Sequence, residues 1–394
     1  SRQGQNPLVE KRLISLPRIL KHIKNAVRPA LYSPVLYGAY SSYRARQQGR
    51  IIQQEQAEYE DRARHLGVSA DWSPEETRDR LYKRLAQRGV VPLPKSKSQL
   101  HIVYASGHSP WDIINIVPAL ANHATVSTYL LSDHGFDAQS QDWVQVRDRM
   151  NGHFVDFLGR LHREKSIDLL LTYYSGHHVS PETIERIGSK GIVTAAFHLD
   201  DRLYFRGEFL GGRLRGPAAV AGAYDLNLTQ APESLVKYRV EGAIPWLWPL
   251  AANPELCYPR RVPFQYDVSL VGTAYGNRIS TVRYLQGNGV RVATFGQGWP
   301  SGFLPAEKFQ EIYCASRINL NFDDIGFTKY QCGKIRDFEV PMCGALMLGT
   351  HNPHLARYFE LDSELFTFRD NKECLQQVRR LLSDQGLCAQ ARKL

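Results

Sequence analysis

The sequence lacks any long apolar run, and this absence argues against a chain that crosses a membrane. No stretch of its 394 residues approaches the roughly 20 apolar residues that a membrane-spanning helix needs. The most apolar N-terminal stretch, from Leu13 to Ile23, is interrupted by Pro17, Arg18 and Lys21. It therefore does not have the continuous core of a signal peptide, and we expect a cytoplasmic protein.

Paired cysteines and the common catalytic motifs are also missing. The six cysteines include no C-x-x-C pair, so the sequence predicts neither a disulfide framework nor a zinc site, and we expect scattered reduced thiols. The chain has no G-x-x-x-x-G-K-[ST], G-x-S-x-G or H-E-x-x-H motif. With 43% hydrophobic and 22% charged residues, the composition is that of an ordinary globular protein, long enough for two to three domains.

The net positive charge of the chain comes almost entirely from its N-terminal segment. Residues 1–50 hold ten Lys and Arg and one acidic residue, whereas the remaining 344 residues hold 39 basic and 38 acidic groups. A nearly neutral body argues against a nucleic-acid-binding protein. Five apolar residues of the segment recur at helical spacing: Leu13, Leu16, Leu20, Ile23 and Val27.

This pattern predicts a basic amphipathic helix with three open roles. Its apolar stripe can lie on an anionic membrane surface, pack on the protein's own body, or form a dimer seam. The first role, assigned to residues 1–50, would place the protein at the inner face of the membrane. Pro17 would kink or delay the helix.

Three regions differ in their sequence pattern. Residues 1–97 are predicted to be a helical, basic extension with a second helix over residues 42–66. A third helix should begin at Ser73, whose spacing to Glu76 is a capping box. Residues 98–255 and 256–394 each alternate short aliphatic runs with helical stretches, which predicts βαβ units and parallel sheets. We expect strands over residues 100–104, 125–131, 168–173, 192–197, 225–228, 243–246, 267–271, 290–294, 318–321, 345–348 and 365–368.

The predicted fold class is therefore α/β, with two doubly wound Rossmann-like domains in series that face each other across a cleft. Ligands of open α/β sheets bind beyond the carboxyl ends of the strands. Candidate site residues are those that directly follow each strand.

The first candidate loop runs from Val268 to Arg278. A predicted strand ends at Gly272, and Thr273 and a second glycine, Gly276, precede a helix that begins near Arg278. Free N–H groups at the helix start together with one arginine make an anion site. The alternative is a routine turn between a strand and a helix.

The second candidate loop runs from Gly333 to Gly344. Lys334, Arg336 and Glu339 lie on a predicted short helix that leads into Gly344 and a strand. A carboxylate here can accept hydrogen bonds from two ribose hydroxyls. Alternatively, Glu339 pairs with Arg336 across one helical turn.

Two further loops carry histidines. After one strand come His198, Asp200 and Asp201, which offer an acid, a base or an orienting group. The alternatives are a metal site, for which no second histidine has suitable spacing, and an N-cap aspartate beside a structural histidine. After the first strand come Gly107 and His108, a weaker signal. The glycines of residues 296–302 lack the spacing of a dinucleotide fingerprint.

Taken together, these loops resemble the CgeB-like (spore maturation protein) family of the GT-B glycosyltransferases. The likeness covers roughly residues 100–383. It comprises a D-V-S-x-V-G strand from Asp267 to Gly272, then Arg278, then an R-x-F-E-x-P-x-C-G motif from Arg336 to Gly344. Weaker matches are N-P-x-L at Asn352, the Tyr358-Phe359 pair, Gly191-Ile-Val-Thr, His198-x-Asp-Asp and the stretch from Trp248 to Asn253.

The resemblance implies a GT-B enzyme that moves a sugar from a nucleotide-activated donor to an unknown acceptor, which could be a glycan, a lipid-linked molecule or a protein. It implies that Glu339 contacts the ribose, that Arg278 and less certainly Lys334 neutralise the pyrophosphate, and that His198 lines the acceptor side. Related retaining enzymes carry an E-x7-E pair, whose first glutamate is Gln331 here. This departure puts the donor sugar and the stereochemistry in doubt.

The resulting expectation is a metal-independent transferase without a cofactor, in which the nucleotide sugar is a co-substrate. We assign catalysis to His198 and Glu339. The donor side is assigned to Gly272, Thr273, Arg278, Lys334, Arg336, Glu339 and Gly344, and the acceptor side to Gly107, His108, Asp200 and Asp201. Two alternatives stay open: a catalytically silent nucleotide-binding or scaffold module, which Gln331 favours, and a nucleotide-sugar epimerase.

Overall fold

The computed structural model describes residues 34–69, 71–107, 110–384 and 386. The predicted basic helix with its Leu13 to Val27 stripe lies outside these residues. The extension begins with α2 (Pro34–Leu66), eight residues earlier than predicted, and continues with α3 (Pro74–Gln87). The Ser73 side chain accepts from the N–H of Glu76, and the Glu76 side chain accepts from the N–H of Ser73. The predicted capping box is therefore confirmed.

The first Rossmann-like unit is built on a six-stranded parallel sheet, here sheet A. Its strand order is β2-β1-β3-β4-β7-β8, with Ile102 of β1 opposite Val126 of β2 and Leu169 of β3. The bounds are β1 (His101–Ser106), β2 (Thr125–Leu130), β3 (Leu169–Thr172), β4 (Val193–His198), β7 (Leu226–Thr229) and β8 (Pro245–Leu247). The predicted strands of this region are confirmed.

Helices cover both faces of sheet A and connect its strands. They are α4 (Pro110–Ala121), α5 (Trp143–Glu164), α6 (Pro181–Gly188), α7 (Asp201–Tyr204) and α8 (Leu235–Val240). Apolar residues of β1, β3, α5 and α6, including Val103, Leu170, Phe154 and Ile184, form one core between them. A two-stranded antiparallel hairpin, β5 (Phe209–Leu210) with β6 (Arg213–Leu214), projects beyond this sheet and was not predicted.

The second unit is built on a five-stranded parallel sheet, sheet C, with strand order β10-β9-β11-β12-β13. Its strands are β9 (Tyr266–Val271), β10 (Val292–Phe295), β11 (Ser316–Asn321), β12 (Met347–Thr350) and β13 (Phe366–Phe368), and its helices are α9 (Asn277–Gly287), α10 (Phe309–Ala315), α11 (Arg336–Met342) and α12 (Asn371–Ser383). All five predicted strands are confirmed. Residues 248–265 connect the two units and contain the predicted boundary at residues 255–256.

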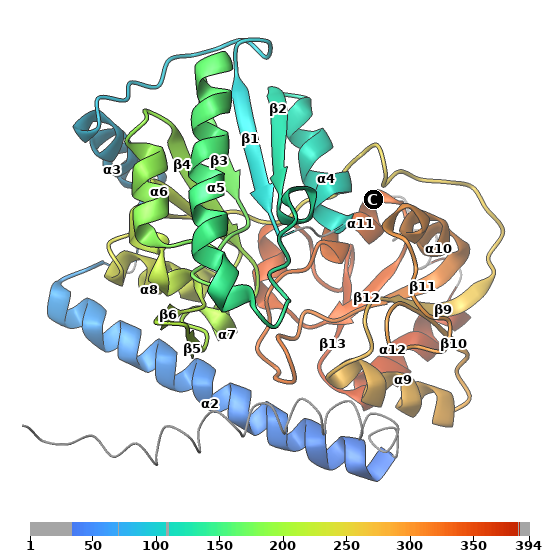
Figure 1. Ribbon diagram of the computed structural model, residues 1–394. Coiled ribbons are helices and arrows are strands. Elements are labelled where there is room, and N and C mark those ends of the chain that lie inside the picture. Colours follow the sequence, from blue (N-terminus) through green and yellow to red (C-terminus); the bar gives the residue numbers. More distant parts are fainter. Residues whose placement is uncertain (1–33, 70, 108–109, 385, 387–394) are drawn as a thin grey trace, which may run out of the picture.

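Helix α2 runs along both units, as Figure 1 shows for the long blue helix. Its first half contacts the second unit, where the Tyr37 hydroxyl donates to the carbonyl oxygen of Gly276 at 3.0 Å and the Gln48 side chain accepts from the N–H of Phe327 at 2.8 Å. Its second half contacts the first unit through Glu55 and Tyr59, which pair with Lys237 and Glu241. One helix thus holds the two Rossmann-like units against each other.

Candidate functional site

The turn after β9 places a buried arginine at the carboxyl edge of sheet C. Arg278 is the second residue of α9 and only 5% exposed. One guanidinium nitrogen, Nη1, donates to the carbonyl oxygen of Thr273 at 3.0 Å, and the group lies 4.5 Å from the centroid of the Tyr275 ring. These contacts hold the cation beside the turn from Gly272 to Gly276.

Two glycines let other loops pack tightly against this turn. A Cβ on Gly276, whose φ is +57°, would lie 2.6 Å from the carbonyl oxygen of Gly326, and one on Gly296 would lie 2.6 Å from that of Gly272. The Trp299 indole also donates to the Gly272 carbonyl at 2.8 Å. The glycines of residues 296–302, discounted above as a dinucleotide loop, therefore support the turn.

A second cation, Arg336, lies beside Arg278 at the start of α11. A Cβ on Gly272 would lie 3.1 Å from Arg278 Nη1 and 3.7 Å from Arg336 Cζ, so both guanidinium groups border this glycine. Burial lowers the pKa of Arg278 to about 10, and the charge of Arg336 acts in the same direction. Two arginines that repel each other beside a glycine turn form a site suited to a multiply charged anion.

A buried carboxylate pair, Asp337 in α11 and Asp323 after β11, orients Arg336 through Asn321, and sequence analysis missed it. Asn321 Nδ2 donates to Asp337 at 2.6 Å and to Asp323 at 3.1 Å, while Asn321 Oδ1 accepts from Arg336 Nε at 3.1 Å. Asp337 also accepts from the N–H of Lys334 at 2.6 Å. Burial raises the pKa of Asp337 to about 6, and burial together with Asp337 raises that of Asp323 well above its usual value. The only signal in the sequence is that Asp323 follows a strand.

The Glu339 carboxylate is buried and hydrogen-bonded within the second unit. It is 4% exposed, and its Oε2 accepts from the Tyr313 hydroxyl at 3.1 Å. Burial raises the pKa of this carboxyl, and Arg336 and Tyr313 oppose the shift. No ion pair joins Glu339 to Arg336 within the part of the chain that the structure describes, so the predicted alternative of a simple helical pair does not form.

The end of β4 places three predicted residues at different depths. His198 is buried, its ring stacks on Tyr238 with centroids 6.1 Å apart, and burial lowers its pKa to about 3, which keeps it neutral. Asp201 is also buried and accepts from the hydroxyls of Ser234 and Tyr238 at 2.9 and 2.8 Å. Asp201 therefore has structural contacts in the first unit, and its acceptor-side assignment stays a prediction.

Asp200 faces the second unit across the cleft. Its φ of +57° is unusual for a residue with a side chain, and its Oδ1 lies 2.6 Å from Lys334 Nζ. Burial lowers the pKa of Lys334, but the combined interactions with Asp200, Cys332 and Tyr275 outweigh it and raise that pKa above its usual range. Sparsely populated backbone conformations of this kind concentrate at functional sites. Asp200 is the N-cap residue of α7, but its side chain makes no capping hydrogen bond.

The remaining predicted site residues, Gly107, His108 and Gly344, do not lie together. Gly107 lies at the carboxyl edge of sheet A, where a Cβ would lie 3.5 Å from His178 Nε2, and His108 lies outside the described residues. Gly344 follows the far end of α11 and precedes β12, with a φ of +61°. It follows the end of α11 at the amino edge of sheet C, and its donor-side assignment stays a prediction.

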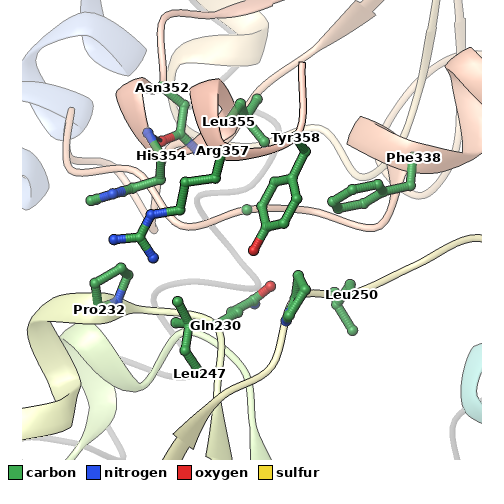
Figure 2. A pocket seen from close by; sticks show the side chains of 12 residues that line it. Gln230, Pro232, Leu247, Leu250, Phe338, Asn352, His354, Leu355, Arg357 and Tyr358 are labelled. Atoms are coloured by element: carbon green, nitrogen blue, oxygen red, sulfur yellow. Dashed lines mark hydrogen bonds between the residues drawn. The ribbon is translucent and has the colours of Figure 1, made fainter. Parts of the chain in front are cut away.

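The carboxyl edges of the two sheets face each other around a cavity. Besides the pair of Lys334 and Asp200, Arg202 Nη1 donates to the carbonyl oxygen of Gln331 at 3.0 Å, and His354 lies 3.1 Å from Glu233. Figure 2 shows Gln230 and Leu247 on one wall and His354, Arg357 and Tyr358 on the other. The cavity has about 390 Å³ of empty space, part of it open to solvent, and Gly333 beside Lys334 also lines it.

Comparisons with known proteins agree with this architecture. Residues 278–393 match a family model described as glycosyl transferase-like. No curated protein matches the chain. Sucrose-phosphate synthase from Thermosynechococcus elongatus superposes with a TM-score of 0.53 and 14% identity, covering 75% of this chain and 92% of that chain. Anabaena HepE in complex with UDP gives a TM-score of 0.48 and 11% identity, covering 74% and 93%.

The chain therefore has the GT-B fold, as the sequence predicted. At 14% identity the likeness to sucrose-phosphate synthase establishes the fold alone, and the assignment to the CgeB-like family stays a prediction. Within the described residues, no three His, Cys, Asp or Glu side chains are grouped to hold a metal ion. None of the helices that the structure describes is long and apolar enough to span a bilayer.

Proposed function

We propose that this protein is a glycosyltransferase that moves a sugar from a nucleotide-activated donor to an acceptor hydroxyl. One observation carries the proposal: Arg278 and Arg336 border a glycine turn at the carboxyl edge of sheet C, and Lys334 interacts electrostatically with Tyr275 of that turn. This edge faces sheet A, and the three cations belong to the segment that matches the glycosyl transferase-like model. A nucleoside diphosphate is the leaving group that such a cluster suits.

The chemistry follows from where charge develops. The bond between the sugar carbon and the β-phosphate oxygen breaks, and the nucleoside diphosphate leaves with the electron pair. The acceptor oxygen forms the new bond to that carbon and loses its proton. Fixed cations at the diphosphate stabilise this developing charge more than the ground state, so they accelerate the transfer. Because side chains supply these charges, the proposed reaction needs neither a metal nor a cofactor.

The proposal gives Glu339 and His198 supporting roles. Glu339 would accept a hydrogen bond from the donor ribose through the oxygen that does not bind Tyr313. His198 would orient a reacting hydroxyl as a neutral group, since its Nε2 is buried and has no hydrogen-bond partner among the described residues. Its lowered pKa argues against a role as a cation near neutral pH.

Gln331 favours one alternative. It stands where retaining relatives carry the first glutamate, and its carbonyl oxygen accepts from Arg202 across the cleft. A catalytically silent module would bind the nucleotide without transferring a sugar. An epimerase would convert the donor without an acceptor. The retaining outcome, the hexosyl nature of the sugar and membership of the CgeB-like family are proposed with the main function and depend on the donor that is found.

The N-terminal segment suggests where the enzyme acts. Its charge and apolar stripe fit an anionic membrane surface, and we propose a peripheral position at the inner face of the membrane. A glycan, a lipid-linked molecule or a protein would then be the acceptor.

A screen of nucleotide sugars tests the function. UDP-, GDP-, dTDP-, ADP- and CMP-sugars are compared by thermal shift and by nucleotide release. A true donor at 100 times its dissociation constant should stabilise the fold by about 2.7 kcal/mol. Release that requires an acceptor indicates a transferase, conversion without one indicates an epimerase, and binding without turnover indicates a silent module.

The Arg278→Gln variant should bind the identified nucleotide about 10- to 150-fold more weakly, because a hydrogen bond to a charged group contributes about 1.5–3 kcal/mol. Arg291→Gln is the matched control, since Arg291 is 90% exposed and pairs with Asp267. Equal nucleotide affinity of both variants would show that the donor site is wrongly placed.

A further inference from the structure

A second group of cations lies at the carboxyl edge of sheet A, remote in sequence from the donor side. It consists of Arg147 of α5 and of Arg213 and Arg215 in and after β6, here called the β6 arginine cluster. Main-chain contacts hold all three in place. Arg147 Nη2 donates to the carbonyl oxygen of Gly211 at 2.8 Å, and Arg213 Nε donates to that of Gly176 at 2.6 Å. The N–H of His177 donates to the carbonyl oxygen of Arg215 at 2.8 Å.

The carboxylates near this cluster do not neutralise it. Among the described residues, neither Arg147 nor Arg213 has a carboxylate within ion-pair distance, and Arg215 has only Glu208, at 3.4 Å and 85% exposed. Asp148 and Glu182, also exposed, act on Arg147 and Arg213 only at longer range. Burial lowers the pKa of Arg213 to about 10, and the charge of Arg147 acts in the same direction.

Two histidines, His177 and His178, lie beside the cluster, and neither changes its net positive charge. His177 Nδ1 accepts from Arg215 Nε at 3.2 Å, which requires a neutral ring. Burial lowers the pKa of His178 to about 3, and His177 and Arg215 act in the same direction. Both rings therefore border the arginines as neutral, polar walls.

Arg147 is the most buried arginine of the cluster and has donors left unpaired by the described residues. It is 3% exposed, and its Nε and Nη1 have no hydrogen-bond partner in the described part of the chain. A buried cation is costly unless an anion or a set of acceptors compensates it. The planar fork of arginine matches the paired oxygens of phosphate and carboxylate groups. The cluster therefore has the charge and the free donors for an anionic group.

The position of the β6 arginine cluster places it on the side from which the acceptor would approach. His178 borders both Gly107, directly after β1, and the cluster, whose Arg213 and Arg215 act on its pKa. The next residues after His198 reach Lys334 of the donor side through Asp200. With the donor phosphates at sheet C, the acceptor has to approach from the edge of sheet A, which is where the cluster lies.

We infer that the acceptor carries an anionic group, a phosphate or a carboxylate, which binds at Arg213 and Arg215 above the buried Arg147. This inference rests on the proposed function, because it names the class of the second substrate. It predicts two separate anion sites in one chain, one on each side of the cleft.

Binding of inorganic phosphate to the full chain, followed by calorimetry, separates the two sites. The R213Q/R215Q variant should lose the acceptor-side site, with affinity reduced at least about 10-fold, while R278Q should retain it. R163Q/R186Q is the control, because it removes the same charge from exposed positions on α5 and α6. All variants are first compared by circular dichroism and thermal melting.

Matched sugars then test the role of the site. Glucose, glucose 6-phosphate and glucuronate are compared as acceptors or as inhibitors of transfer. The charged sugars should act at concentrations at least about 10-fold lower than glucose, and R213Q/R215Q should abolish that preference without changing nucleotide affinity.

The outcomes distinguish this inference from the proposed function. Normal nucleotide binding together with phosphate binding that ignores Arg213 and Arg215 would overturn the inference and leave the function standing. Phosphate binding that depends on these arginines, in a chain that binds no nucleotide, would support the anion site and overturn the function. If R213Q/R215Q fails to fold, R215Q alone provides the test, because Arg215 is half-exposed.

Discussion

Glu339 combines a structural contact with its proposed contact to the donor, and two substitutions separate them. Glu339→Ala would leave the buried Tyr313 hydroxyl without its acceptor and should cost about 1–3 kcal/mol of unfolding free energy. Glu339→Gln keeps an oxygen for Tyr313 but removes the charge. It should fold normally and weaken nucleotide binding.

Denaturant unfolding and nucleotide titration of both variants check this prediction. The Tyr313→Phe variant is the control, because it removes the hydroxyl and leaves the carboxylate in place. Full nucleotide affinity in a folded Glu339→Gln protein would contradict a ribose contact and leave Glu339 with its structural role alone.

Asp324 gives a prediction about pH. The residue is 6% exposed, accepts from Asn277 Nδ2 at 3.0 Å, and has a pKa that burial raises to about 6. In the unfolded chain an aspartate titrates near about 3.9. Between about pH 4 and 6 the folded state therefore holds the additional proton, and this group makes the unfolding free energy fall as the pH rises.

Asp324→Asn removes that ionisation. The variant should match the parent near pH 4 and exceed it by up to about 3 kcal/mol at pH 7, from about two pKa units at 1.36 kcal/mol each. Urea unfolding of both proteins at several pH values measures the difference, and Asp79→Asn, an exposed change, is the control. A difference that does not vary with pH would show that Asp324 does not titrate as described.

At the scale of single elements, the sequence predicts those defined by local pattern. Eleven aliphatic runs predicted strands, and all eleven occur in the two sheets because buried parallel strands need continuous apolar side chains. The β5–β6 hairpin escaped prediction because each strand has only two residues. Helix α2 was predicted too short, because its first turns are stabilised by contacts such as that of Tyr37 with Gly276, which no local pattern encodes.

For the same reason, the donor side of the site could be predicted from the sequence and the β6 arginine cluster could not. Gly272, Arg278, Lys334 and Arg336 could be placed together because each follows a strand or opens the next helix, and these ends share one edge of sheet C. The β6 arginine cluster could not, since Arg147 lies 66 residues before Arg213 and meets it only through the hairpin. The buried hydroxyl partners of Asp201 could not be predicted either, because Ser234 and Tyr238 lie more than 30 residues away in the sequence.

Helix α2 is anchored by a buried ion pair whose removal should be costly. Glu55 Oε1 lies 2.7 Å from Lys237 Nζ, and their side chains are 8% and 0% exposed. Among the described residues, Glu55→Ala leaves the buried lysine with the carbonyl oxygen of Arg202 as its hydrogen-bond acceptor and the Phe205 ring 5.8 Å away. Breaking one partner of such a pair costs about 3–5 kcal/mol.

Chemical denaturation followed by circular dichroism measures this loss. The control Glu60→Ala removes an exposed carboxylate of the same helix that bonds only Gln56, and it should change stability little. The double variant Glu55→Leu with Lys237→Met should recover most of the loss, because an apolar pair needs no compensation. Equal stability of Glu55→Ala and Glu60→Ala would mean that the pair does not anchor α2.

At the scale of the whole molecule, several contacts set the spacing of the two Rossmann-like units, and three of them are the bridge of Lys334 to Asp200, the pairing of Arg202 with the Gln331 loop, and helix α2. Each of the three touches a loop that borders the proposed donor site. Whatever acts on α2 can therefore act on the site.

The structure changes where the chain should be truncated to test the membrane prediction. The assignment covered residues 1–50, but residues 37–50 include Tyr37 and Gln48, which pack on the body of the protein. A chain that starts at residue 51 would therefore lose contacts that hold α2. The appropriate truncation starts at residue 34, where the described part of α2 begins.

Flotation with vesicles that contain anionic lipid should recover the full chain and not the chain from residue 34. The segment removed holds seven Lys and Arg and one acidic residue, each cation contributes about 1 kcal/mol near such a surface, and salt screens the attraction. Binding should therefore weaken steeply as salt is raised, and vesicles of neutral lipid should recover neither protein. Binding that survives the truncation would assign the contact to the folded body, and a truncated chain that no longer folds would show that the apolar stripe packs on the protein itself.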